Sequence, residues 1–380
     1  MVNVWLIDED AVTVLGRRSV RSTGWHRQDA VAGALAHWSG GRAMRSELDR
    51  LGIPLNLAPM EARLVAQLPV GDSWQYEPKW DGFRCLAFRK GDEVELRAKS
   101  GKSLTRFFPE VVANLRALPP HPFVIDGELV IEVGRVPDFD ALQMRLHPAE
   151  SRIRRLASDT PATFVAFDCL LRQLGRPLLA RPFSDRRRAL ETVAVDMGNG
   201  NGLRVTSFTR ELRTAKRWLN HRHKALDGVV AKRLDLAYLP GARAMLKVKC
   251  LRTADCVVGG FRFETGRRLV GSLLLGLYDA KGLLHHVGFT SAIPRAQKAE
   301  LTKRLEGLIS PPGFTGDAPG GPSRWSTERS AAWQPLRPKL VVEVVYDHVT
   351  GGRFRHGTKL VRWRPDKAPM GCTCDQLDPH

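Results

Sequence analysis

Apolar and polar residues alternate with a period of two along much of the chain, which is typical of β-strands. The stretch 74–101 predicts two strands joined by a turn at Lys90–Asp92. Phe123–Glu132 predicts a second strand pair, with a tight turn at Asp126–Gly127. Ala162–Leu171 is an apolar run rich in β-formers and predicts a buried strand. The middle of the chain is therefore expected to consist mainly of sheets.

Two further short strands alternate between apolar and basic residues, Gly228–Arg233 and Met245–Cys250. Because neighbouring side chains of a strand point to opposite faces, Lys247 and Lys249 are expected on one face. A helical pattern is found in three segments, Phe139–Arg155, Ser184–Val195 and Glu211–His223. This combination of sheets and helices indicates the α+β class.

The last third of the chain carries four strand-like runs between residues 254 and 350. A helix-like segment, Arg295–Leu308, lies between the third and fourth runs, and a loop rich in proline and glycine follows at 311–323. Five or so short strands with one inserted helix predict a small β-barrel. Residues 1–50 carry no chemical motif, and we expect a poorly ordered N-terminal extension there.

The charge balance favours a polyanionic partner. Lysine and arginine total 59 against 40 acidic residues, which gives a formal net charge of +19. Nucleic acid is the first candidate, an anionic membrane surface is the second, and an unspecific basic surface stays open. The hydrophobic content of 43% is sufficient for globular cores.

The sequence also restricts where the protein is expected to work. No stretch reaches the roughly 18 apolar residues of a membrane span, and the start of the chain lacks the basic and apolar regions of a signal peptide. The six cysteines form no Cys-x-x-Cys pair, which favours a reduced compartment. We therefore expect a cytoplasmic, nucleoid-associated protein.

The first motif with chemical content is Lys79, which follows a strand and precedes Asp81, Gly82 and Arg84. Taken alone, this pattern also fits a turn with solvated charges. The functional interpretation is a nucleophilic lysine, because a neutral amine attacks phosphorus. Partial burial and nearby cations favour the neutral form, and the candidate cations are Arg84 and the two lysines at 247 and 249.

Three further motifs supply charges that complement such a nucleophile. Glu128 offers a carboxylate for a ribose hydroxyl or a Mg²⁺ ion, and Asp227 offers a second carboxylate for metal. Lys247 and Lys249 form a candidate phosphate clamp. Each motif alone also fits a hairpin turn, a strand start or a solvated strand face. Together, in one domain, they match what nucleotidyl transfer needs: metal, charge stabilisation and positioning.

Residues 76–84, YEPKWDGFR, resemble the first motif of the covalent nucleotidyltransferases, the superfamily of ATP-dependent DNA ligases, RNA ligases and capping enzymes. DGE at 126–128, FVAFD at 164–168, DGVVAK at 227–232, KVK at 247–249 and RPDK at 364–367 resemble later motifs, in the same order. The residues in and around these motifs are most similar to the stand-alone bacterial ligase C type of ATP-dependent DNA ligase. The resemblance covers about residues 52–375.

The resemblance implies a fold and a domain division. It implies a nucleotidyltransferase (ATP-grasp-like) domain of antiparallel sheets with flanking helices, followed by a C-terminal OB-fold β-barrel. The adenylation domain is placed at 51–250 and the OB-fold domain at 251–380, after the extension 1–50.

The resemblance also implies roles for individual residues. Lys79 would attack the α-phosphate of ATP and hold AMP, with Glu77 beside the adenine edge and Phe167 stacked on the base. Arg84 and Glu128 would contact the ribose and the reacting phosphates, and Asp227 would bind metal together with Glu128. Further nucleotide contacts are expected from four basic residues: Lys247 and Lys249 at the α-phosphate, and Arg364 and Lys367 at the leaving pyrophosphate.

Two positions depart from the family pattern. Asp227 stands where glutamate is usual, and the shorter carboxylate reaches less far toward a metal. Lys99 stands where arginine is frequent, and lysine keeps the charge but loses the bidentate fork. We nevertheless include Lys99 among the expected nucleotide-binding residues.

The function implied is sealing of 5′-phosphate/3′-hydroxyl nicks in duplex DNA during repair, with ATP and Mg²⁺ or Mn²⁺ as cofactors. The expected partner is nicked double-stranded DNA, bound by a monomer, with Ku-type or excision-repair proteins as further candidates and no membrane. An RNA ligase or an RNA-capping guanylyltransferase is the alternative within the superfamily. A non-catalytic nucleic-acid-binding protein is the alternative outside it.

Overall fold

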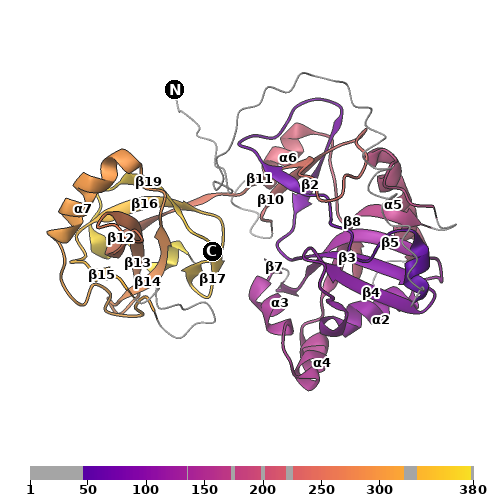
Figure 1. Ribbon diagram of the computed structural model, residues 1–380, viewed down its shortest axis with the longest axis horizontal. Coiled ribbons are helices and arrows are strands. Elements are labelled where there is room, and N and C mark those ends of the chain that lie inside the picture. The colour runs from indigo at the N-terminus through magenta and orange to yellow at the C-terminus, as the bar shows by residue number, and fades with distance from the viewer. Residues whose placement is uncertain are drawn as a thin grey trace. The chain divides into compact units, whose positions relative to one another are not determined.

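The structure is a computed structural model that describes residues 46–134, 136–172, 176–197, 202–219, 226–320 and 332–377. It divides into two compact units, at residues 1–249 and 250–380 (Figure 1). Most of the predicted extension, residues 1–45, lies outside the described residues. The remainder enters a short 3-10 helix, η1 (Glu47–Leu51), whose Leu48 and Leu51 are buried in the core of the first unit.

The first unit contains a four-stranded sheet in the order β1-β11-β10-β2. Its strands are β1 (Ala62–Leu64), β11 (Met245–Lys249), β10 (Gly228–Arg233) and β2 (Trp74–Lys79). The pairs β10–β2 and β10–β11 are antiparallel, whereas β1 and β11 are parallel. The sheets were expected to be antiparallel, and this one is mixed, because the strand that enters the unit runs alongside the strand that leaves it.

A five-stranded sheet in the order β4-β3-β5-β8-β9 completes the first unit. Its strands are β3 (Phe83–Lys90), β4 (Glu93–Ala98), β5 (Phe123–Val130), β8 (Thr163–Arg172) and β9 (Leu203–Val205). Neighbouring strands are antiparallel except for β8 and β9. A small hairpin of β6 (Glu132–Val133) and β7 (Val136–Pro137) follows β5.

The stretch 74–101 contains three strands and not the two predicted. Lys79 pairs with Gly228 in the four-stranded sheet, whereas Phe83 pairs with Leu129 in the five-stranded sheet. The chain therefore changes sheets between them, and the predicted turn near Gly91 joins the second and third strands. The nucleophile candidate stands at the end of the strand that makes this change.

The predicted turn at Asp126–Gly127 is wrong, because both residues lie inside the continuous strand β5. Asp126 is fully buried, and its carboxylate accepts two hydrogen bonds of 2.7 Å from Arg84 on the neighbouring strand. A Cβ atom at position 127 would lie 2.6 Å from the ring of Phe164, so the paired strand approaches too closely for any side chain. Tertiary pairing here overrides a local turn signal.

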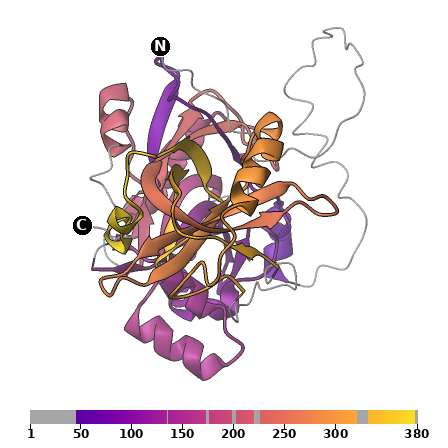
Figure 2. The same ribbon diagram turned by 90° about the vertical axis from the view of Figure 1, so that its left-hand side faces the viewer.

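Helices cover the outer face of the five-stranded sheet. They are α2 (Pro109–Ala117), α3 (Phe139–Arg145) and α5 (Phe183–Met197), with the 3-10 helix η2 (Thr105–Phe107) before α2. A further helix, α4 (Glu150–Asp159), packs beside α2. Apolar residues of α2, α3 and α5 share one buried cluster with the sheet. The segment Phe139–Arg155, predicted as one helix, forms the two helices α3 and α4, because Pro148 interrupts it. Helix α4 projects at one end of the unit (magenta in Figures 1 and 2).

The four-stranded sheet is covered on one face by α6 (Leu212–Trp218). The predicted helix Glu211–His223 is thus described as far as Leu219, and 220–225 lie outside the described residues. The other face is turned toward the five-stranded sheet. One buried cluster contains Met245 from the first sheet together with Leu86 and Val124 from the second. The two sheets therefore pack face to face.

The second unit is built on the sheet order β14-β13-β12-β16-β19. Its strands are β12 (Arg252–Phe263), β13 (Val270–Tyr278), β14 (Leu284–Thr290), β16 (Val341–Tyr346) and β19 (Lys359–Trp363). The short strand β15 (Gln334–Pro335) pairs with β12. Two further short strands, β17 (Val349–Thr350) and β18 (Arg353–Phe354), form a hairpin. Thr290 at the end of β14 forms a parallel bridge with Thr358, next to β19. The two edges of the sheet therefore meet at this point.

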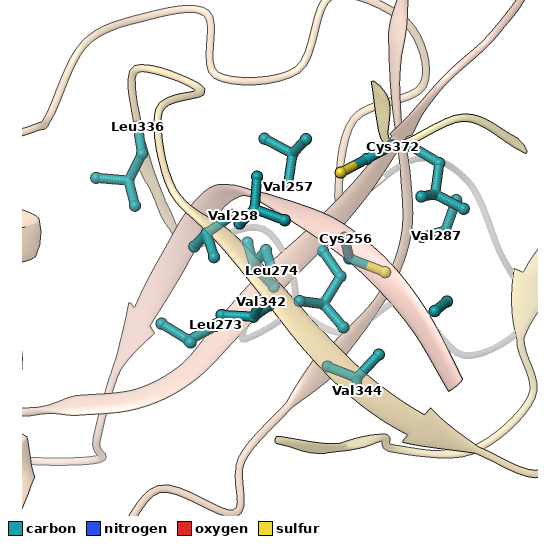
Figure 3. Close-up of a cluster of buried hydrophobic side chains, with 14 of the residues drawn as sticks. Cys256, Val257, Val258, Leu273, Leu274, Val287, Leu336, Val342, Val344 and Cys372 are labelled. Carbon is teal, nitrogen blue, oxygen red and sulfur yellow. The ribbon is translucent and has the colours of Figure 1, made fainter. Parts of the chain in front are cut away.

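The core of the second unit lies inside this curved sheet. Val257, Leu274 and Val342 from three neighbouring strands converge in it (Figure 3). The inserted helix α7 (Lys298–Glu306), preceded by the 3-10 turn η3 (Arg295–Gln297), adds apolar side chains to the same core. The 3-10 turns η4 (Pro369–Gly371) and η5 (Cys374–Gln376) follow. Over the described ranges, we find no helix with the length and hydrophobicity needed to cross a membrane.

We expect Gly127→Ala to destabilise the first unit by about 1–3 kcal/mol, because the added methyl group overlaps the ring of Phe164 and the carbonyl oxygen of Val165. Gly357→Ala is the control, since its new atom would meet a neighbour at an ordinary 3.5 Å. Differential scanning calorimetry should show a transition lowered by several degrees for the first variant only. Equal melting temperatures for both variants would contradict the close strand approach.

Candidate active site

A cavity lies between the facing sheets of the first unit. Both sheets contribute to its lining, as does the segment before β1. The lining residues are Pro59, Met60, Glu61, Ala62, Glu77, Pro78, Lys79, Trp80, Arg84, Lys99, Glu128, Phe167, Val230, Lys232, Met245 and Lys247. Seven of the residues predicted from the sequence are among them: Glu77, Lys79, Arg84, Lys99, Glu128, Phe167 and Lys247.

Strand register explains why basic residues distant in sequence meet here. Gly228 pairs with Lys79 on one side and with Lys249 on the other, so these residues form one row across three strands. Glu77 and Lys247 flank Val230 in the next row on the same face. The predicted common face of the two lysines thus follows from the period of the strand. Lys247 lines the cavity, whereas Lys249 stands in the row of Lys79 without lining it.

The Lys79 ammonium group forms an ion pair with the Asp227 carboxylate. The exposed fraction of the lysine side chain is 24%, and that of the aspartate is 4%. The amide of Asp227 also donates to the carbonyl of Lys79 over 2.9 Å, which fixes one strand end to the other. The carboxylate is therefore placed to accept a proton from the Lys79 ammonium group.

Two partners hold the guanidinium group of Arg84 in place. Its guanidinium group makes a bidentate pair with Asp126 and donates to the carbonyl of Met60 over 3.1 Å. Tyr238 donates its hydroxyl to the same aspartate over 2.7 Å. The aspartate neutralises the charge of Arg84. The guanidinium group therefore contributes fixed, oriented N–H groups to the cavity, with little net positive charge.

Burial raises the pKa of Glu128 from 4.5 to about 7, against the opposing effect of the cations Arg84 and Lys79. Glu128 pairs across the strands with Arg84 and lines the cavity. Near neutral pH this carboxyl group therefore changes between a hydrogen-bond donor and an anion. An anionic oxygen ligand of this kind suits a hard divalent cation.

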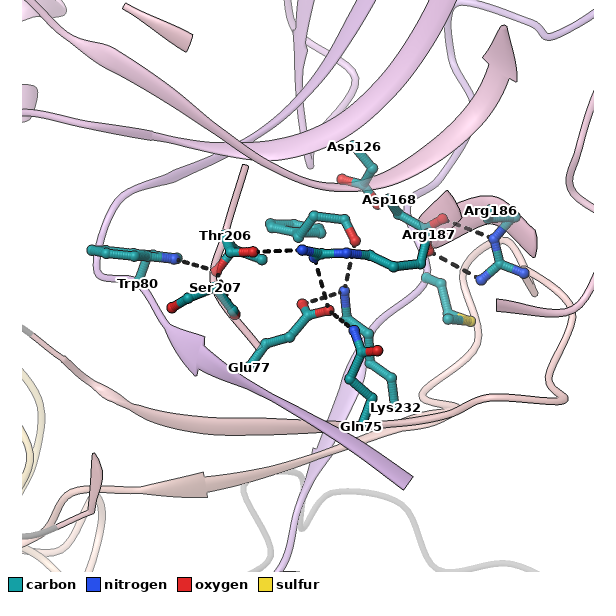
Figure 4. A network of polar contacts seen from close by, with 12 residues as sticks. Gln75, Glu77, Trp80, Asp126, Asp168, Arg186, Arg187, Thr206, Ser207 and Lys232 are labelled. Carbon is teal, nitrogen blue, oxygen red and sulfur yellow. Dashed lines mark hydrogen bonds and ion pairs between the residues drawn. The ribbon is translucent and has the colours of Figure 1, made fainter. Parts of the chain in front are cut away.

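Glu77 is the centre of a buried polar network (Figure 4). Its carboxylate lies 2.7 Å from the ammonium nitrogen of Lys232, accepts from Gln75 over 2.9 Å, and lies 3.6 Å from Arg187. Two carboxylate oxygens accept up to about four hydrogen bonds, so an amino group of a ligand can still join this network. The structure thus places Glu77 in the cavity, where Lys232 and Arg187 balance its negative charge.

Lys232 is a cavity residue to which sequence reasoning assigned no role. It is 3% exposed, donates to the carbonyl of Phe167 over 3.0 Å, and lies 4.5 Å from the centre of that ring. Burial lowers the pKa of Lys232, and the Glu77 carboxylate opposes this effect. The alternation in β10 was the available signal, because it places Lys232 on the same face as Gly228 and Val230.

Phe167 presents a small surface to the cavity. Its exposed fraction is 9%, and the Arg84 guanidinium carbon lies 4.4 Å from the ring centre. Trp80, another lining residue without an assigned role, donates its indole N–H to Thr206 over 2.9 Å and lies beneath Arg204. Phe167 and Trp80 thus both contribute aromatic side chains to the cavity lining.

Arg364 and Lys367 lie in the second unit and are held together by one carboxylate. Asp255 lies 2.8 Å from Arg364 and 3.0 Å from Lys367. The exposed fractions of the two basic side chains are 18% and 32%. They form a small surface cluster of that unit.

The cavity combines amines and carboxylates with Lys79, the candidate nucleophile, which is paired with Asp227. Groups of three or more His, Cys, Asp or Glu side chains able to hold a metal ion do not occur in the part of the chain that the structure describes. A cation here would thus share its ligands between the protein, water and a bound phosphate. The arrangement suits transfer of a phosphorus group to an amine.

Comparison with known proteins identifies relatives over most of the chain. The family model described as ATP dependent DNA ligase domain matches residues 59–249, and the one described as ATP dependent DNA ligase C terminal region matches 266–367. DNA ligase C2 of Mycolicibacterium smegmatis is 47% identical over 343 residues, which cover 85% of this chain and 95% of that protein.

Two further comparisons agree. DNA ligase C of Mycobacterium tuberculosis is 45% identical over 343 residues, covering 85% of this chain and 94% of that protein. A solved structure of a Lig E DNA ligase has a TM-score of 0.50 at 16% identity and covers 80% of this chain and 99% of its own. This last likeness concerns the fold.

We expect the carboxyl group of Glu128 to titrate near pH 7, because burial disfavours its anion. With ¹³C-labelled glutamate, the side-chain resonance that disappears in Glu128→Gln identifies it, and its shift against pH gives the midpoint. The folded chain keeps this proton to higher pH than the unfolded chain, so Glu128 lowers stability as pH rises from about 4.5 to 7. A midpoint below pH 5 would contradict the assignment.

Proposed function

Since the chain belongs to the ATP-dependent DNA ligases, we propose that it seals nicks in duplex DNA by storing AMP on Lys79. It has the fold of that family, a nucleotidyltransferase unit followed by an OB-like unit, and we assign nucleotide transfer to the first unit. The observation that supports the choice of lysine is its place in the cavity, in an ion pair with Asp227 and one row away from Lys247.

In the first step, the neutral Nζ of Lys79 attacks the α-phosphorus of ATP. A P–N bond forms, the bond from this phosphorus to the bridging oxygen of the β-phosphate breaks, and pyrophosphate leaves with the electron pair. Asp227 accepts the proton that the amine loses, because its carboxylate already contacts the ammonium group. Lys247 offsets the negative charge that develops on the phosphate oxygens.

In the second step, an oxygen of the 5′-phosphate at the nick attacks the phosphorus of the stored AMP. The P–N bond breaks, and the nitrogen of Lys79 regains a proton, for which Asp227 is the nearest donor. In the third step, the oxygen of the 3′-hydroxyl attacks the 5′-phosphorus and its proton passes to solvent. The bond from this phosphorus to the bridging oxygen breaks, AMP leaves with the electron pair, and the phosphodiester is closed. Each step exchanges one bond to phosphorus for another, so the protein's task is positioning and charge compensation.

The residues present fit a Mg²⁺ or Mn²⁺ ion. Glu128 and Asp227 offer hard oxygen ligands near Lys79, and such ions commonly combine one or two carboxylates with water and substrate phosphates. When bound, the ion would offset charge on the phosphate oxygens. Arg84 and Glu77 would orient the nucleoside, with Phe167 against the base.

The remaining parts of the proposal concern DNA and partners. The net charge of +19 supports binding through phosphates, which is independent of base sequence. We propose that Arg364 and Lys367 reach the leaving pyrophosphate, that Lys99 and Lys249 contact phosphates, and that the protein acts as a monomer in nucleoid DNA repair. Ku-type or excision-repair proteins are the proposed partners. Co-purification experiments that recover neither class would exclude them.

We expect Lys79→Ala to lose the covalent AMP adduct and the sealing of an ordinary nick, because no nitrogen remains to attack the nucleotide. The same variant should still seal a nick whose 5′ end already carries AMP, since the third step does not use Lys79. The adduct is measured with α-³²P-ATP, and sealing on a labelled nicked duplex.

The control for this variant is Lys216→Ala, which removes an exposed lysine of α6. It should label and seal like the wild type. An adduct that persists in Lys79→Ala would move the nucleophile to another residue.

The choice of substrate has its own test. We expect the wild type to form its adduct with ATP and not with GTP, and to seal nicked DNA at least tenfold faster than nicked duplex RNA. Equal labelling by GTP would favour a capping guanylyltransferase, and faster sealing of RNA would favour an RNA ligase.

A further inference from the structure

An ion pair joins the edges of the two sheets on the solvent side of the cavity. Glu61 directly precedes β1, the edge strand of the four-stranded sheet, and Lys99 directly follows β4, the edge strand of the five-stranded sheet. The Glu61 carboxylate lies 3.0 Å from the Lys99 ammonium nitrogen. Both residues line the cavity that contains Lys79 and Lys247.

The two partners differ in how firmly they are held. The amide of Glu61 donates to the carbonyl of Ala242 over 2.8 Å, and its carbonyl accepts from Met245 over 3.1 Å. Its side chain is 28% exposed, and its second oxygen lies 3.9 Å from Arg243. The Lys99 side chain is 60% exposed and stands in the turn after its strand. Lys99 is therefore the partner that can change position.

A polyphosphate placed against Lys79 brings several negative charges to this side of the cavity. Lys99 is the cation that can follow them, but it is already paired with Glu61. A fixed carboxylate close to incoming phosphates opposes their binding, since like charges repel and the existing pair must separate. The proposed chemistry gives Glu61 no other task.

We propose that Glu61 sets the affinity of the cavity for ATP by holding Lys99 in an ion pair that the phosphates of the nucleotide must break. This inference rests on the proposed function, because it needs the phosphates of ATP beside Lys79. Glu61 acts through Lys99 and is a positioning residue.

A role of Glu61 as a cation ligand predicts the opposite sign, because removing a ligand of the ATP-bound metal weakens ATP binding. A purely structural role predicts a loss of stability with no gain in affinity. Exposed ion pairs contribute little to folding, typically 0–1 kcal/mol. The direction of the change in ATP affinity therefore separates the three roles.

The experiment measures the rate of AMP-adduct formation against ATP concentration for the wild type, Glu61→Gln, Lys99→Met and the double variant. Glu61→Gln should lower the ATP concentration for half-maximal rate about fivefold, the size expected for an exposed ion pair. Its maximal rate should stay unchanged. In the Lys99→Met background, the same change should alter the half-maximal concentration by less than about twofold.

Glu93→Gln is the matched control, since it removes an exposed carboxylate at the other end of β4, away from the cavity lining. It should behave like the wild type. A half-maximal concentration that rises or stays constant in Glu61→Gln would overturn the inference. So would a decrease of the same size in both backgrounds, because the effect would then not run through Lys99.

Failure of the proposed function is recognised separately. If the wild type forms no adduct, nucleotide transfer to Lys79 is wrong. Calorimetric titration of the Lys79→Ala protein with ATP, with and without Glu61→Gln, then tests Glu61 without the chemical step. Tighter binding by the double variant supports the inference, and equal or weaker binding overturns it.

Discussion

The buried ammonium group of Lys232 ties the two sheets of the first unit together at the cavity. It stands on β10 of one sheet and donates to the carbonyl of Phe167 on β8 of the other. A charge in this position is tolerated because the Glu77 carboxylate lies 2.7 Å away. Removing this carboxylate would leave the buried ammonium group without its ion-pair partner. The separation of the sheets, and with it the width of the cavity, therefore depends on this pair.

Much of the site could be predicted because strand period places it. The alternation of basic and apolar residues puts Lys247 and Lys249 on one face, and pairing through β10 brings that face to Glu77 and Lys79. The same rule could have identified Lys232, which occupies the common face of β10. The interruption of the predicted helix at Pro148 could also have been predicted, since proline disfavours the helical conformation of the residue that precedes it.

Other features depend on contacts between segments that no local pattern reveals. Asp126 and Gly127 have the composition of a turn, but Arg84, 42 positions earlier, pairs with the aspartate, and Phe164 packs over the glycine. The ion pair of Glu61 with Lys99 likewise follows from the meeting of two sheet edges. Local composition indicates which conformation a segment prefers, but contacts with segments distant in sequence determine which conformation it adopts.

Four cations that line the cavity each have an anionic partner. Arg84 has Asp126, Lys79 has Asp227, Lys232 has Glu77 and Lys99 has Glu61. A cavity of unpaired cations would bind phosphates tightly, but tight binding of the ground state does not speed the chemical step. An enzyme that must release pyrophosphate and then transfer AMP benefits when a cation can change its anionic partner from a carboxylate to a phosphate and back. Paired cations provide this, because a phosphate that binds to Lys99 must first displace the Glu61 carboxylate, which returns when the phosphate leaves.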